Sequence, residues 1–174
     1  MEYLLEQIGV LLVAIALFLA GLFNPSALPT VAPLEAFGTS TAVVTSVIDG
    51  DTIDVILEGD TNITRVRYIG INTPEPYAHK TPDCGSEAAS MRNSELVKNK
   101  TVTLITGIDP WDKYDRLLAY VYVGDTFVNK ALIAEGYATI IMIKPNTRYQ
   151  TEFTNLYTEA RKGKLGMWAN CSDV

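Results

Sequence analysis

Residues 42–71 read AVVTSVIDGDTIDVILEGDTNITRVRYIGI, and this stretch decides the fold. Three runs in it are rich in Val, Ile, Thr and Tyr, namely Ala42–Ile48, Thr52–Leu57 and Ile63–Ile71. Short runs of this composition, bounded by Gly, Asp and Asn, predict β-strands. Asp49-Gly50 stands between the first two runs, and this dipeptide is typical of a tight hairpin turn. We therefore expect a β-hairpin followed by a third strand.

The third run alternates in character along its length. One face carries Ile63, Arg65, Arg67 and Ile69, and the other carries Val66, Tyr68 and Gly70. A period of two is typical of a half-buried strand. The segment that follows, Asn72–Cys84, holds three prolines and is expected to be a long loop without regular structure.

The rest of the chain completes a small barrel. We expect a helix from an N-cap at Ser86 to about Asn99, followed by strands at Val102–Ile108 and Leu117–Val123. Two further helices are expected, one at Phe127–Glu135 ended by Gly136 and one at Tyr149–Lys162 ended by Gly163. Five short strands with a helix inserted between the third and the fourth predict an α+β, mainly β fold. We expect a closed five-stranded OB-type barrel with about three helices.

The first forty residues differ in kind from the rest. Ile8–Phe23 is an unbroken apolar run, and a linker rich in Pro and Ala follows over residues 24–40. We expect residues 1–23 to form a hydrophobic helix that is either a signal peptide or an uncleaved membrane anchor. Both alternatives place the domain of residues 41–174 outside the cytoplasm, as a secreted or membrane-anchored protein.

Two cysteines, Cys84 and Cys171, fit an exported domain. Two cysteines alone do not make a zinc site, and no Cys-x-x-Cys spacing is present. They are either unrelated thiols or a disulfide that joins a loop to the C-terminal tail, and export favours the disulfide.

The net charge of −6 is opposite in sign to the basic footprint that phosphate binding usually leaves. Residues 1–37 hold three glutamates and no Lys or Arg, so the remainder still carries −3. Any affinity for nucleic acid therefore depends on a local arrangement of charge that is assisted by a cation.

Three stretches of the domain hold residues suited to chemistry. Asp51 follows the Asp49-Gly50 turn and offers a carboxylate to a hard cation, although the turn alone explains the dipeptide. Arg67 lies within an apolar strand, where it is either a rim residue that faces water or a paired charge, and Asn72-Thr73-Pro74 then presents Glu75 on a loop. Asp112–Arg116 reads by itself as a solvated loop, with Arg116 at a strand entrance.

Taken together, these stretches resemble the staphylococcal (thermonuclease-like) nuclease family. The resemblance is carried by Asp-Gly-Asp-Thr at 49–52, Arg-x4-Asn-Thr-Pro-Glu at 67–75 and Asp-Lys-Tyr-x-Arg-x-Leu-Ala-Tyr at 112–120. It continues through Val128–Leu132 and Lys144–Asn146 to Gly166–Trp168. It therefore spans essentially the whole domain after the linker, and the order and spacing make it specific.

The resemblance implies a site for one Ca²⁺ ion, held by the Asp51 carboxylate, the Asn72 side chain and the Thr73 main-chain carbonyl. Oxygen donors on loops suit such a hard cation. It also implies a set of catalytic and substrate-binding roles. Glu75 matches the general base, Arg67 and Arg116 match the arginines that grip the scissile phosphate, and Lys113 and Tyr114 match residues that contact the neighbouring phosphate.

These matches lead us to expect an exported, monomeric, Ca²⁺-dependent and sugar-nonspecific endonuclease that cuts DNA and RNA to 3′-phosphate ends. The alternative is a non-catalytic nucleic-acid-binding module of the same fold, which loss of the arginines or the glutamate would mark. A binding protein for a small acidic ligand would leave Asp51 and the Thr-Pro-Glu loop unexplained. The sequence leaves open the preference for DNA or RNA and the biological role.

Three positions depart from the best-known member of the family, which has aspartate in place of Asn72, glycine in place of Asp115 and base-pocket tyrosines within the stretch Ile140–Ile143. We expect weaker charge at the metal site, and base stacking that is weaker or supplied from elsewhere. Asp115 is expected to orient or partly neutralise Arg116. Three other residues are given no role: Trp111 and Trp168 are expected to pack, and His79 to be an exposed loop residue.

Overall fold

The computed structural model describes residues 38–76 and 81–172. The described residues belong to a single compact unit. The expected hydrophobic helix of residues 1–23, most of the linker and His79 lie outside the described residues. Within the described part, no helix is both long enough and apolar enough to cross a membrane.

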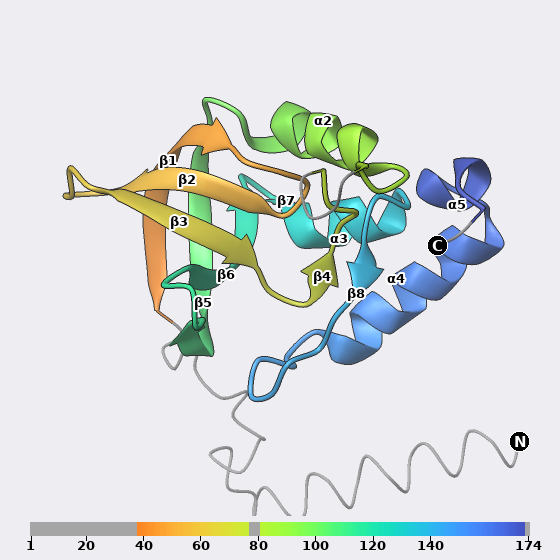
Figure 1. The fold of residues 1–174 in the computed structure, drawn as a ribbon. Coiled ribbons are helices and arrows are strands. Elements are labelled where there is room, and N and C mark those ends of the chain that lie inside the picture. The colour runs from red at the N-terminus through yellow and green to blue at the C-terminus, as the bar shows by residue number, and fades with distance from the viewer. Residues whose placement is uncertain (1–37, 77–80, 173–174) are drawn as a thin grey trace, which may run out of the picture. The chain divides into compact units, whose positions relative to one another are not determined.

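The described residues form a mainly β domain with flanking helices (Figure 1). Its strands are β1 (Thr39–Val47), β2 (Thr52–Leu57), β3 (Ile63–Tyr68), β4 (Ile71–Asn72), β5 (Thr101–Trp111), β6 (Leu117–Val123), β7 (Thr126–Phe127) and β8 (Thr139–Ile140). Its helices are α2 (Ser86–Val97), α3 (Val128–Ala134), α4 (Gln150–Lys162) and α5 (Met167–Asn170).

The sheet closes on itself. The strands follow the order β3-β2-β1-β5-β6-β7, and a further parallel pairing joins β3 to β6. Closure removes the free edges that an open sheet would leave. The five long strands are the five expected from the sequence, and α2 lies between the third and the fourth of them. The expected OB-type barrel with about three helices is therefore confirmed.

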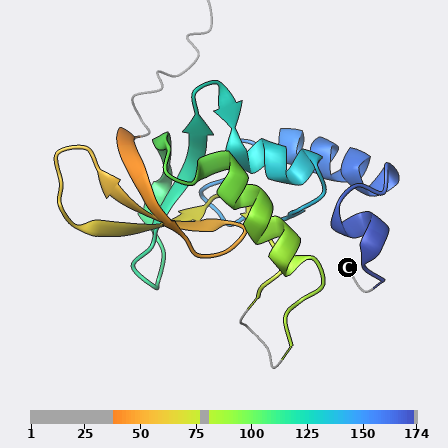
Figure 2. The same cartoon turned by 90° about the horizontal axis from the view of Figure 1, so that it is seen from above.

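Apolar side chains that alternate along the strands fill the barrel. Val44, Ile53, Val55, Val66 and Leu104 are all almost completely buried. Burying one such side chain contributes about 1.5–3 kcal/mol relative to leaving it exposed. Figures 1 and 2 place α3, α4 and α5 on the same side of the barrel, away from the tip of the β2–β3 hairpin.

An aromatic cluster fastens these helices to the barrel. Tyr120 on β6 meets Tyr149 edge to face with ring centroids 4.7 Å apart. Tyr149 stacks on Phe153 of α4 at 5.8 Å, and Phe153 is completely buried. Such pairs add about 0.5–1.5 kcal/mol beyond the burial of their area.

The expected third strand, Ile63–Ile71, is interrupted. β3 ends at Tyr68, Gly70 takes a φ of 83°, and Ile71–Asn72 form the separate strand β4, which pairs with β8. A Cβ on Gly70 would lie 2.7 Å from Cε2 of Phe153. The break follows from packing against α4. The alternation of residues 63–71 contains no signal of this contact.

The helix ends also differ from expectation. Gly85, at φ 87°, is the N-cap of α2 and no side chain caps that helix, so the assignment of the cap to Ser86 is wrong. Ser86 is buried in the first turn, and its N–H donates to the Asp83 carbonyl. α2 ends at Val97, two residues early, because Asn99 turns left-handed at φ 58°. Gly136, with φ 80°, ends α3 as expected.

Candidate active site

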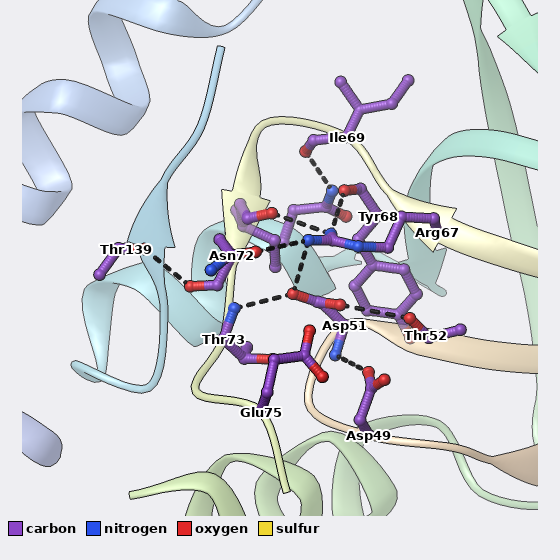
Figure 3. A network of polar contacts seen from close by, with 12 residues as sticks. Asp49, Asp51, Thr52, Arg67, Tyr68, Ile69, Asn72, Thr73, Glu75 and Thr139 are labelled. Atoms are coloured by element: carbon purple, nitrogen blue, oxygen red, sulfur yellow. Dashed lines mark hydrogen bonds and ion pairs between the residues drawn. The ribbon is translucent and has the colours of Figure 1, made fainter. Parts of the chain in front are cut away.

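Arg67 is held by both of its terminal nitrogens (Figure 3). Nη1 donates to the main-chain oxygens of Tyr68 and Ile71, each at 2.9 Å. Nη2 donates to Asn72 Oδ1 at 2.9 Å and pairs with Asp51 Oδ2 at 3.0 Å. Among the described residues, Nε has no hydrogen-bond partner. The guanidinium is thus fixed in place and directs Nε alone toward other ligands.

Asp51 is fully buried beneath the guanidinium. Its Oδ2 accepts a 2.7 Å hydrogen bond from the Thr73 N–H, and its own N–H donates to Asp49 Oδ1 at 2.9 Å. Burial raises the pKa of Asp51 to about 7, against the opposing effect of Arg67. A single arginine therefore compensates this carboxylate incompletely, and a second cation nearby would favour its ionised form.

The oxygens of Asp51 and Asn72 converge. Asp51 Oδ2 and Asn72 Oδ1 both contact the same nitrogen, Nη2 of Arg67. The antiparallel pairing of Asn72 with Thr139, together with the 2.9 Å hydrogen bond from Thr139 Oγ1 to the Asn72 carbonyl, fixes this strand end. Within residues 38–76 and 81–172, no group of three or more His, Cys, Asp and Glu could hold a metal ion.

The donor set fits a hard cation. It consists of one buried, under-compensated carboxylate and the amide oxygen of Asn72, so both donors are oxygens. Ca²⁺ accepts such a set in flexible geometry, with water or substrate oxygens completing its coordination. The oxygens of Asp51 and Asn72 are of the kind that such a cation accepts.

Glu75 lies on the loop after β4, half-buried, with its carboxylate directed toward the Asp51 region in Figure 3. Burial raises the pKa of Glu75 and Asp49 adds to the rise, whereas Arg67 and Arg116 lower it. Glu75 is thus a half-buried carboxylate under the influence of two cations, at the edge of the Asp51 and Arg67 group.

Arg116 reaches the same place from the start of β6, the strand that pairs directly with β3. The parallel pairing of β3 and β6 sets Leu117 opposite Val66, so Arg116 arrives beside the strand that carries Arg67. Its Nε donates to Asp112 Oδ2 at 2.7 Å. Among the described residues, its terminal nitrogens have no hydrogen-bond partner. Arg116 therefore offers its two terminal nitrogens to a ligand. Arg67 offers only Nε, because both of its terminal nitrogens are bonded within the protein.

Asp112 organises the Arg116 loop, a role that the sequence did not reveal. Its Oδ1 accepts from the N–H groups of Tyr114 at 2.9 Å and Arg116 at 3.0 Å. Partial burial alone would raise the pKa of Asp112, but the hydrogen bonds from Arg116 and Tyr114 outweigh it and lower the pKa. The residue expected to orient Arg116 was Asp115, and the ion pair instead runs to Asp112. Asp115 takes a φ of 58°, which explains why a glycine suits that position.

A cavity of about 510 Å³ joins these groups. Arg67, Arg116, Asn72 and Glu75 line it, while Asp51 and Thr73 lie buried beneath. Its rim carries Trp111, Lys113, Tyr114, Ile141, Ile143 and Lys144. The structure thus brings the expected catalytic residues together with Lys113 and Tyr114 around one hollow.

Two aromatic rings stand on the exposed rim. Tyr114 is 66% exposed, and the Lys113 ammonium and the Arg116 guanidinium lie 4.9 Å and 5.4 Å from its ring centre. Trp111 is 51% exposed, so the expectation that it packs is wrong. Its place at the end of β5, just before the Asp112 loop, was the sequence signal for a role near the site. Trp168 does pack, edge to face on Tyr157 at 5.4 Å.

Asn146 fastens the segment that carries Lys144 to the end of β5. The Asn146 amide makes two hydrogen bonds with the Asp109 main chain, at 3.2 Å and 2.8 Å. The Lys144–Pro145 peptide bond is cis. Residues 141–143 are outside any strand, since β8 ends at Ile140.

The structure joins Cys84 and Cys171 in a disulfide, with their Cα atoms 5.8 Å apart. The bond links the loop before α2 to the segment after α5. No free cysteine is present among the described residues.

Residues 65–170 match the family model described as staphylococcal nuclease homologue, over well more than half of the chain. The chain belongs to this family. The match covers Arg67, Asn72, Glu75 and Arg116 and begins after Asp51.

Individual members of the staphylococcal nuclease family show the same likeness. The chain is 39% identical over 127 residues to a thermonuclease of Staphylococcus intermedius, across 72% of this chain and 74% of the relative. It is 35% identical over 145 residues to a thermonuclease of Staphylococcus hyicus, across 79% and 84%. It is 42% identical over 132 residues to endonuclease YncB of Bacillus subtilis, of which it spans 61%.

Proposed function

We propose that this protein is a Ca²⁺-dependent, sugar-nonspecific endonuclease that hydrolyses DNA and RNA outside the cytoplasm and leaves 3′-phosphate ends. The observation that carries the proposal is the meeting of Arg67, Glu75 and Arg116 at one cavity, beside two converging oxygens of Asp51 and Asn72. The names of the family members, thermonuclease and endonuclease, point the same way.

The chain's own residues suffice for most of the reaction. A phosphodiester seated in the cavity would receive hydrogen bonds from the free terminal nitrogens of Arg116 and from Nε of Arg67. These fixed cations would stabilise the charge that develops on the phosphoryl oxygens in the transition state. A Ca²⁺ ion bound by Asp51, Asn72 and Thr73 would supply Lewis-acid polarisation of the same phosphate.

Glu75 would take the proton of the attacking water. The water oxygen then forms a bond to phosphorus as the bond from phosphorus to the 5′ oxygen breaks. The 5′ oxygen takes a proton from a solvent water as it leaves, so one product ends in a 5′ hydroxyl and the phosphate stays on the 3′ side. Lys113 and Tyr114 on the rim would hold the next phosphate without taking part in the chemistry.

The test uses plasmid DNA and a folded RNA with purified protein, with Ca²⁺ or with excess chelator. We expect both nucleic acids to be cleaved only with Ca²⁺, and Mg²⁺ to replace Ca²⁺ poorly. The products should carry 3′-phosphate ends and 5′-hydroxyl ends, and a polynucleotide kinase should phosphorylate the 5′ ends directly. Glu75→Gln should bind a labelled oligonucleotide and cut it at a small residual rate. Full activity in chelator would refute the metal assignment. Binding without cleavage by the wild-type protein would favour a non-catalytic binding module.

The proposed location rests on two features. The apolar run Ile8–Phe23 can direct export, and the disulfide between Cys84 and Cys171 belongs to oxidising compartments. If the domain is anchored, protease added to intact cells should digest it. If the N-terminal segment is cleaved, the released domain should appear in the medium. Protein found solely in the cytoplasm, with both thiols free, would refute the location.

A further inference from the structure

We propose that Asp83 is a positioning residue for Glu75, and that the Cys84–Cys171 disulfide holds Asp83 in the place this requires. The inference rests on the proposed function, because it takes Glu75 as the general base. It adds a residue to the site that neither the family motifs nor the cavity lining includes.

Asp83 and Glu75 are joined by a pair of hydrogen bonds. The Glu75 N–H donates to Asp83 Oδ2 at 3.0 Å, and the Asp83 N–H donates to the Glu75 carbonyl at 3.0 Å. This reciprocal pair, which we call the Glu75 clamp, closes the base of the loop that starts after Glu75. Among the described residues, both main-chain hydrogen bonds of Glu75 go to Asp83.

Glu75 has little other support from regular structure. The two-residue strand β4 ends three positions before it at Asn72, and α2, the next element in the part of the chain that the structure describes, begins at Ser86. Pro74 and Pro76 flank Glu75 and have no N–H to donate. The direction of the Glu75 carboxylate toward the Arg67 and Asp51 group therefore depends on the clamp.

Asp83 is in turn fixed from two sides. Its carbonyl accepts the N–H of Ser86 at 3.1 Å, at the start of α2. Cys84 follows directly and is bonded to Cys171. The C-terminal partner is anchored, because Met167 is buried and its N–H donates to the Gly136 carbonyl at 3.0 Å, while the Cys171 N–H donates to the Met167 carbonyl at 2.8 Å.

The chain of connection thus runs from α3, through α5 and the disulfide, to Asp83 and Glu75. Cys84 is exposed, so a reductant can reach the bond. Reduction would free Asp83 on one side and loosen the clamp without touching the arginines or the donors proposed for Ca²⁺. A misplacement of about 1 Å in a catalytic group can cost on the order of 100-fold in rate.

The experiment compares full-chain variants at a temperature well below the unfolding transition of each. Asp83→Ala and the double variant Cys84→Ser/Cys171→Ser should lower kcat about 10-fold or more, with KM and Ca²⁺ binding near those of the wild type. Asp83→Asn keeps a side-chain oxygen that can accept from the Glu75 N–H and should recover most of kcat. Asp125→Ala, which removes an exposed carboxylate in the turn between β6 and β7, is the matched control and should be unchanged.

A double-mutant cycle separates positioning from general stability. In a Glu75→Gln background, Asp83→Ala or loss of the disulfide should reduce the residual rate no further, because the group being positioned is gone. An equal reduction in both backgrounds, or a wild-type kcat in Asp83→Ala, would overturn the proposal.

A readout without catalysis keeps the clamp distinct from the proposed function. Amide exchange of the Glu75 N–H, followed by NMR, should be slow in the wild type and accelerate in Asp83→Ala and after reduction. If the wild-type protein does not cleave nucleic acid yet shows these exchange rates, the nuclease proposal fails and the clamp stands as structure alone. Unchanged exchange in both cases would refute the clamp itself.

Discussion

Arg67 and Arg116 bring the same functional group to the cavity but are held in different ways. Both terminal nitrogens of Arg67 bind protein oxygens, including buried Asp51, and its side chain is 11% exposed. Arg116 is held through Nε alone, by Asp112. Arg67 therefore also stabilises the fold, a role that Arg116 lacks, although the family motif treats both as phosphate ligands.

Alanine substitutions at the two positions should separate the role in stability from the role in phosphate binding. Arg67→Ala leaves the Asp51 carboxylate buried without its partner, so we expect a loss of about 3 kcal/mol in the free energy of unfolding together with loss of activity. Arg116→Ala should reduce kcat on the order of 10²–10³-fold and leave stability unchanged. Thermal unfolding followed by circular dichroism, alongside initial rates, checks both. Equal stability of the two variants would contradict the assigned difference.

Asn72 sets the charge of the cation site. Its Oδ1 lies beside Asp51 Oδ2 on the same arginine nitrogen, and it contributes no negative charge. Calcium affinity depends partly on the charge of the ligands, so Asn72→Asp should tighten Ca²⁺ binding in the free protein. In the wild type, DNA and Ca²⁺ should each tighten the binding of the other by the same factor. Calorimetry with and without a non-cleavable oligonucleotide measures both effects.

The outcome that would contradict this reading is equal Ca²⁺ affinity of the wild type and Asn72→Asp. It would mean that the side chain at this position is not a ligand. The cleavage rate of Asn72→Asp is expected to fall, since the added negative charge opposes the phosphate.

Trp111 is expected to supply stacking that the isoleucines of the rim do not. It is 51% exposed beside the cavity, whereas Ile141 and Ile143, also on the cavity lining, belong to the stretch in which the best-known family member has tyrosines. Trp111→Ala should weaken oligonucleotide binding by about 1–3 kcal/mol, and Trp111→Phe by less. In a Trp168→Phe background, the remaining fluorescence of Trp111 should be quenched by oligonucleotide. Unquenched fluorescence and unchanged affinity would rule out stacking on this ring.

At the scale of elements, local sequence patterns predicted the strands and turns that depend on neighbouring residues. The hairpin of β1 and β2 and the strand β6 lie where alternation and turn residues placed them. The division between β3 and β4 was missed, because Phe153 on α4 imposes it from far along the chain. The parallel pairing of β3 with β6 is likewise invisible in either strand, yet it is what sets Arg116 beside Arg67.

The same limit applies to the site. Residues that carry a motif, such as Asp51, Glu75 and Arg116, were identified from the sequence, because the chemistry constrains their type and spacing. Asp112 and Asp83 were missed as supports, because their roles depend on hydrogen bonds that exist only in the folded loops. Neither loop residue has a periodic or compositional signal of its own.

Gly70 and Gly59 provide a matched test of the element break. Both have a φ of 83°, but a Cβ on Gly70 would meet the Phe153 ring while one on Gly59 would meet nothing within 4 Å. Gly59→Ala should cost about 1 kcal/mol from backbone strain. Gly70→Ala should cost about 1–3 kcal/mol more, because the ring must shift. Equilibrium urea unfolding gives the two values, and equal costs would show that Phe153 yields freely.

At the scale of the whole molecule, an acidic chain is proposed to bind an acidic polymer. The net charge is −6, so long-range attraction to nucleic acid is absent and repulsion is expected. The cavity concentrates the opposite charge locally, with Arg116, Lys113 and Lys144 around its rim. Binding should therefore rely on few ionic contacts, assisted by a cation that offsets the carboxylates.

The dependence of binding on salt measures how many contacts there are. Each neutralised phosphate of a single strand contributes about −0.7 to the slope of log K against log salt concentration. Three rim cations predict a slope of about −2 for a short single-stranded oligonucleotide bound to the Glu75→Gln protein in constant Ca²⁺. Lys144→Ala should make the slope less negative by about 0.7, while Lys162→Ala, at the distant end of α4, should leave it unchanged. A slope several units steeper, or an equal effect of the two lysines, would show that nucleic acid is held by a wider surface than this cavity.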